Sequence, residues 1–179
     1  MVTHVEGPDE PPETLTDPRE LLTGYLDHYR DALLRKLDGL TGEQLRSTPL
    51  PSGWTPLELL RHLTYVEIRW FRWGFLGEAL ERPWGDRGPG PRDRSEPWHV
   101  PEEETFEELR AEFLETCERS RRIVAEAALD ELARPGPHHP APDRRPSLVW
   151  ILFHLLQEYA RHLGHLDAAR ELIDGRVGE

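Results

Sequence analysis

The chain has 179 residues, of which 37% are hydrophobic and 31% charged, and its formal net charge is -12 at pH 7. This size and composition predict one soluble domain with a hydrophobic core, and the acidity argues against binding to nucleic acid or to an anionic membrane surface. A single cysteine excludes an internal disulfide and any zinc site that needs several cysteines.

The N-terminal segment, residues 1–16, is acidic and rich in proline. It offers little apolar surface to bury, so it is predicted to be a flexible arm that precedes a single domain over residues 17–179. It lacks the basic and apolar regions of a signal peptide. No apolar run in the chain approaches the roughly 20 residues of a membrane-spanning helix. A cytoplasmic location without a membrane partner is therefore expected.

The first helix is predicted to begin at Asp17 and Pro18, which suit the N-cap and the first helical position. Leucine and tyrosine then recur at three- and four-residue steps from Leu22 to Leu40, which indicates a helix of about six turns. A connector follows, with a short helical turn expected around Glu43.

A second helix is predicted from a capping box formed by Thr55 and Glu58, and it is expected to run to about Gly77. At about 100° per residue, several apolar side chains fall within about 80° of His62. His62 is therefore predicted to point inward. The residues that share its face are Leu59, Val66, Trp70 and Trp73.

The segment after this helix, residues 82–104, is rich in proline and glycine and is predicted to be a long crossover. Loops of this length in compact domains are usually functional or mobile. Trp84 and Trp98 indicate that the crossover docks on the domain. Two roles stay open, a lid over a substrate and a connection that the tryptophans merely pin.

A third helix is predicted to begin with the capping box of Thr105 and Glu108 and to end near Leu132. Cys117 falls on its apolar stripe. A cysteine in that position behaves as a small hydrophobic side chain, so Cys117 is interpreted as a core residue and not as a nucleophile.

A second proline-rich loop, residues 134–146, contains His138 and His139. Two histidines in an exposed loop are more often bystanders than ligands, and metal binding is not expected of them. The fourth helix is predicted to begin at Ser147 as N-cap and to stop at Gly175.

The fourth helix carries four polar residues on one arc of roughly a quarter turn. These residues are His154, Glu158, His162 and His165. Histidines and a carboxylate at the edge of a buried face are costly unless something compensates them. A divalent metal would do so, and so would an ordinary hydrogen-bond network.

The predicted fold is all-α, a four-helix bundle with a long crossover between the second and third helices, because no useful strand alternation is present. Bundle cores hold metals with inward side chains from facing helices. Three protein ligands plus an open position are the arrangement of a catalytic zinc site. His62 and the polar arc of the fourth helix are therefore the candidate ligands.

The second and last predicted helices resemble those of the DinB-like (DinB/YfiT-like) four-helix-bundle metalloproteins. The matching motifs are Trp54-Thr55-Pro56 with Leu60-Arg61-His62-Leu63, and residues 154–175. The chain is similar over residues 17–175, most of all to the branch that contains mycothiol-dependent maleylpyruvate isomerase.

The register of this resemblance around Gly164 implies that His62, Glu158 and His162 bind the metal. Typical members have histidine at the position of Glu158, whereas the isomerase branch is similar in having glutamate there. The resemblance gives His154 and His165 no ligand role, and both are interpreted first as structural histidines. Alternatively, His154 is a hydrogen-bond partner of a metal ligand or a base beside a metal-bound water, and His165 bonds a ligand or substrate.

A His/Glu/His set suits zinc and also nickel or another first-row ion. The resemblance implies a metal-dependent enzyme that acts on a small molecule, a thiol-dependent transferase or isomerase with mycothiol or bacillithiol as co-substrate, or a metal-dependent hydrolase. A non-catalytic metal- or ligand-binding bundle and an interaction protein without metal are the alternatives. Both a monomer and a homodimer are compatible with the sequence.

Overall fold

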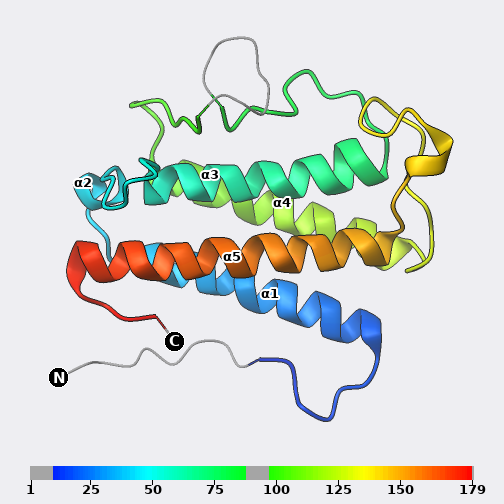
Figure 1. Ribbon diagram of the computed structural model, residues 1–179, viewed down its shortest axis with the longest axis horizontal. Coiled ribbons are helices and arrows are strands. Elements are labelled where there is room, and N and C mark those ends of the chain that lie inside the picture. The colour runs from blue at the N-terminus through cyan, green and yellow to red at the C-terminus, as the bar shows by residue number, and fades with distance from the viewer. Residues whose placement is uncertain (1–9, 88–96, 179) are drawn as a thin grey trace.

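The computed structural model describes residues 10–87 and 97–178 (Figure 1). The helices in these ranges are α1 (Pro18–Leu37), α2 (Gly42–Leu45), α3 (Pro56–Glu67), the π-helix η1 (Ile68–Phe75), α4 (Phe106–Glu126), the 3-10 helix η2 (Pro142–Arg144) and α5 (Leu148–Asp174). Apart from two isolated β-bridges, the described residues contain no β-structure. The predicted all-α bundle is confirmed. None of these helices is long and apolar enough to cross a membrane.

The long helices pack in pairs, α1 against α5 and α3 against α4 (Figure 1). The crossover returns along the length of the bundle after η1, so α3 and α4 run in the same direction. The start of α1 lies beside the end of α4, where Arg19 donates hydrogen bonds to the carbonyl oxygens of Val124 and Ala127. Because of the long crossover, the helices do not simply alternate in direction along the chain, as short loops would require.

The predicted helix starts coincide with the observed caps. The hydroxyl of Thr55 accepts from the backbone N–H of Glu58, and the carboxylate of Glu58 accepts from the backbone N–H of Thr55 at 2.8 Å. Thr105 forms the same arrangement at the start of α4. Ser147 caps α5, which ends at Gly175 with φ of 77°, a left-handed conformation that favours glycine.

The prediction that the third helix ends near Leu132 is wrong, because α4 ends at Glu126. The following residues turn toward the start of α5. The backbone N–H of Leu148 donates to the carbonyl oxygen of Glu131, and that of Ala133 donates to Pro146. Pairing with a distant segment therefore satisfies the backbone groups that a longer helix would have paired within itself.

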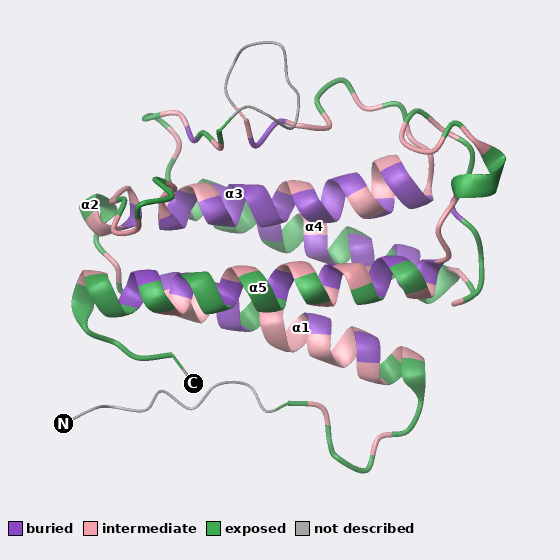
Figure 2. Ribbon diagram, in the orientation of Figure 1, coloured by how far each residue is buried: buried purple, intermediate pink, exposed green. Residues whose placement is uncertain are grey.

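The core lies between the four long helices, whose buried faces turn inward (Figure 2). Fully burying one leucine or phenylalanine contributes about 1.5–3 kcal/mol. Cys117 is only 1% exposed, as predicted for a small core residue. The core residues with no exposed surface include Leu33, Leu37, Leu60, Phe113 and Leu155.

A polar network crosses this core and links three helices. Glu67, at the end of α3, has no exposed surface. Its carboxylate accepts two hydrogen bonds of 2.9 Å from Arg30 on α1 and one of 2.8 Å from the hydroxyl of Tyr159 on α5. The bidentate pairing compensates the cost of burying both charges.

Candidate metal centre

His62 on α3 faces Glu158 and His162 on α5, and each residue offers one donor atom within 4.8 Å of the other two. The Nε2 atom of His162 lies 3.4 Å from a carboxylate oxygen of Glu158. Ligands at the usual zinc distances of about 2.0–2.2 Å stand roughly 3.4 Å apart in a tetrahedron. A shift of about 1 Å or less per side chain would therefore bring all three donors onto one ion. Both the geometry and the donor types fit a first-row divalent cation.

Asp86 in the crossover fixes the imidazole of His62. A carboxylate oxygen of Asp86 lies 2.8 Å from Nδ1 of His62, and the other oxygen accepts from Arg69 at 2.7 Å. Asp86 has no exposed surface. With Nδ1 engaged, Nε2 of His62 is the atom left for a ligand, which is the usual arrangement of a metal-binding histidine and its carboxylate partner.

Asp86 was not found by sequence reasoning, because loop residues follow no helical period. Its neighbours hold that part of the crossover against α3. The guanidinium of Arg61 donates to the carbonyl oxygen of Gly85 at 3.1 Å. A Cβ atom at Gly85 would lie 2.2 Å from the hydroxyl oxygen of Tyr65, so a larger residue there would require the Tyr65 side chain to move. In the sequence, the sign of a functional residue here was a Gly-Asp pair directly after Trp84, the residue predicted to dock the crossover on the domain.

The electrostatics keep His62 and Glu158 in their metal-binding protonation states. Burial lowers the pKa of His62 to about 4, although the hydrogen bond to Asp86 opposes this shift. Hydrogen bonds from His154 and His162 hold the pKa of Glu158 well below its usual range. At neutral pH, His62 is therefore neutral and Glu158 is ionised, as metal ligation requires.

The two remaining polar residues of the α5 arc lie in different surroundings. The Nε2 atom of His154 is 3.2 Å from Glu158, and its ring packs near Trp70 and Trp150, at centroid distances of 4.3 and 5.2 Å. His165 is exposed and is not one of the three clustered donors. His154 thus touches the candidate centre directly, whereas His165 lies outside it.

The crossover docks on the bundle through both of its tryptophans. The ring of Trp98 stacks on His62 at a centroid distance of 4.0 Å and an interplanar angle of 20°. Trp84 lies edge-on to Trp73 and under the guanidinium of Arg69. Trp98 therefore covers one face of a candidate ligand. Residues 88–96 of the predicted crossover, for which a lid and a pinned connection both stayed open, lie outside the described residues.

A comparison with models of protein families identifies the family of the chain. The model of a family described as mycothiol-S-transferase matches residues 21–175. The chain belongs to this family. This result confirms the resemblance to the mycothiol-related branch of the DinB-like proteins and supports a thiol-dependent, transferase-type function with a small-molecule thiol as co-substrate. No curated protein sequence matches the chain significantly.

In this member of the mycothiol-S-transferase family, the predicted exposure of His138 and His139 is wrong. Both are half-buried, and their rings stack on each other at 4.3 Å. His138 also stacks on Trp73 at 4.3 Å, above the π-helix η1. Burial lowers the pKa of His138 to about 4. The two histidines pack the loop onto η1 and are not among the clustered donors.

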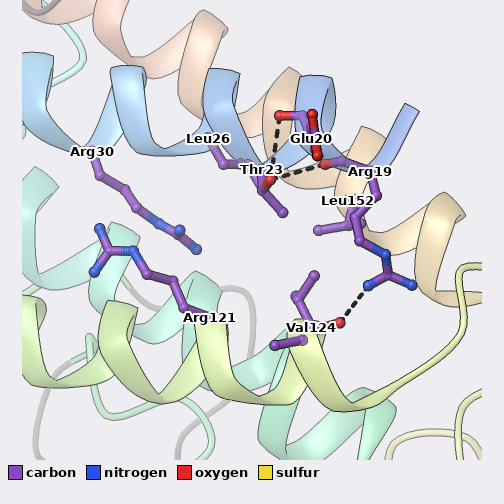
Figure 3. A pocket seen from close by; sticks show the side chains of 9 residues that line it. Arg19, Glu20, Thr23, Leu26, Arg30, Arg121, Val124 and Leu152 are labelled. Carbon is purple, nitrogen blue, oxygen red and sulfur yellow. Dashed lines mark hydrogen bonds between the residues drawn. The ribbon is translucent and has the colours of Figure 1, made fainter. Parts of the chain in front are cut away.

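A cavity of about 250 Å³ lies between α1 and α4 and has none of the candidate ligands in its lining (Figure 3). Its arginines are engaged within the protein. Arg19 binds carbonyl oxygens at the end of α4, Arg30 binds Glu67, and Arg121 donates to Asp27 at 3.0 Å. This cavity, to which α5 also contributes Leu152, is separate from the candidate metal centre.

Proposed function

We propose that the protein is a metal-dependent thiol S-transferase in which His62, Glu158 and His162 hold one divalent cation. Zinc suits this set best, and nickel or another first-row ion is compatible with it. The observation that carries the proposal is the convergence of three donors from two facing helices, one of them oriented by Asp86. Family membership supports a thiol of the mycothiol type as the co-substrate.

When bound, the cation would act as a Lewis acid that lowers the pKa of a thiol beside it. The chain's own residues prepare that position. Asp86 orients His62, Trp98 keeps water from one face of the imidazole, and the charge of Glu158 offsets part of the cation's charge. In the reaction, the thiol sulfur forms a bond to an electrophilic carbon, the leaving group departs with its electron pair, and the thiol proton passes to solvent.

The metal assignment is tested by elemental analysis of untagged protein. We expect about one equivalent of metal in the wild type and little in His62→Ala or His162→Ala, because three protein ligands define the site. His138→Ala is the matched control, since it removes a half-buried histidine that is not a clustered donor. Equal metal content in all four proteins would contradict the assignment.

The transfer activity is tested with mycothiol and chlorodinitrobenzene. The expected reaction forms a carbon–sulfur bond, releases chloride and gives the thiol proton to solvent. We expect turnover with the metal-loaded wild type and with His138→Ala, and a loss of turnover in His62→Ala. Full metal content without any thiol consumption would instead favour a bundle that holds metal without catalysis.

A further inference from the structure

A second cavity, of about 320 Å³, opens where η1, the loop after α4 and the start of α5 meet. Its volume lies within the range of small-molecule pockets. The residues that matter in its lining are Trp70, His139, Arg144, Arg145 and Trp150. We refer to this cavity as the Trp–Arg pocket.

The Trp–Arg pocket adjoins the candidate metal centre. Its two indoles, Trp70 and Trp150, both lie against the ring of His154, which is 3.2 Å from Glu158. Trp150, His154, Glu158 and His162 stand four residues apart, so they form one stripe along α5. A single imidazole therefore separates the pocket from a candidate ligand.

The walls of the pocket are aromatic and partly open. Trp150 is 50% exposed, which is unusual for so large an apolar side chain. The rings of Trp70 and Trp150 are 5.5 Å apart and inclined at 52°. Indole faces and edges bind planar conjugated groups favourably. Among the described residues, the buried Nε2 atom of His139 has no hydrogen-bond partner.

One edge of the pocket is basic, in a protein with a net charge of -12. Arg145 is held in place, because it donates to the carbonyl oxygens of Pro142 and Ala133 at 3.2 Å each. Arg144 is exposed, and no ion pair of its guanidinium occurs among the described residues. Asp143 is next in sequence but is not part of the lining.

We propose that the Trp–Arg pocket binds the acceptor of the transfer reaction, and that this acceptor is a planar conjugated electrophile carrying a carboxylate. The proposal rests on the proposed function, which places the thiol at the neighbouring centre. The indoles supply the surface for the conjugated ring, and the arginines supply donors that match a carboxylate. The same arginines repel the quaternary ammonium ligands that aromatic pockets otherwise attract.

The test is calorimetric titration with two probes of the same ring, naphthoate and the neutral naphthylmethanol. Arg144→Gln should weaken naphthoate binding about tenfold, the effect of losing one hydrogen bond to a charged group, and should leave naphthylmethanol binding unchanged. Trp150→Ala should weaken both probes. Arg122→Gln, an exposed arginine on α4, is the control and should alter neither.

The same titration on metal-free His162→Ala protein separates this proposal from the proposed function. We expect naphthoate to bind His162→Ala as it binds the wild type, whether or not the protein carries out thiol transfer. Naphthoate binding that is absent from the wild type, or equal in the wild type and Arg144→Gln, would overturn the pocket assignment. Such a result would not change the conclusions drawn from the metal content and the transfer activity, because these are measured independently.

Discussion

A carboxylate oxygen of Asp86 lies 2.8 Å from Nδ1 of His62, and this hydrogen bond joins the crossover to helix α3 at the candidate metal centre. The second carboxylate oxygen binds Arg69, so the orientation of Asp86 is itself fixed. Asp86 therefore shapes the centre, because it determines which nitrogen of His62 faces the other donors.

Loss of Asp86 should weaken metal binding. We expect Asp86→Ala to lower metal affinity about 10–100-fold, the usual effect of removing the carboxylate partner of a ligating histidine. Affinity can be measured by competition with a chromophoric chelator. Asp143→Ala, at an exposed position, should keep the wild-type affinity. An Asp86→Ala protein that folds and binds metal as tightly as the wild type would refute this role.

Removal of Glu67 should destabilise the bundle strongly. Glu67→Ala leaves the guanidinium of Arg30 buried without its main partner, and we expect the free energy of unfolding to fall by about 3–5 kcal/mol. Tyr159→Phe, which removes one hydrogen bond to the same carboxylate, should cost about 1 kcal/mol. Urea denaturation measures both. Similar losses for the two variants would show that the Arg30–Glu67 pair contributes little.

Stability should fall at acidic pH, in part because of His138. Burial lowers the pKa of this histidine from 6.5 to about 4, so between these values the unfolded chain binds a proton that the folded chain does not. The contribution of His138 is thus fully present above about pH 6.5 and is lost as the pH falls toward 4. His138→Phe keeps a stacking ring and should reduce this dependence. The measurement is urea denaturation at several pH values, and an unchanged dependence would be the contrary result.

Cys117 should be inert in the folded protein. It is 1% exposed, and burial raises the pKa of its thiol well above the usual range. A thiol-specific chromogenic reagent should therefore label it only after denaturant is added. Cys117→Ala should retain thiol transfer with a modest loss of stability. Fast labelling of the native protein together with loss of turnover would instead identify Cys117 as a functional thiol.

The sequence predicts the helices well because their signals are local. Thr55, Thr105 and Ser147 mark three helix starts, and each forms the expected side-chain cap. The π-helical geometry of η1 was not predicted, since its residues follow the same apolar pattern as an α-helix. The early end of α4 was missed because the competing backbone partners come from a distant part of the chain.

The candidate site is only partly encoded in such local patterns. Helical periodicity placed four polar residues of α5 on one arc but did not distinguish among them. The family register singled out Glu158 and His162, and in the structure these two meet His62 whereas His165 remains exposed. The choice depends on where α3 crosses α5, a tertiary relationship that no single-helix pattern contains. Asp86, in a loop, has no periodic signal at all.

The pairing of α1 with α5 has a consequence for biosynthesis. Helix α1 is synthesised before all other helices of the bundle and has α5, which is made after them, as its main neighbour, so the bundle cannot close until α5 has been synthesised. Two of the three candidate ligands, Glu158 and His162, arrive on that last helix. A nascent chain that stalls before α5 therefore carries His62 without its partners, and it exposes the apolar face of α1 to chaperones, proteases and aggregation.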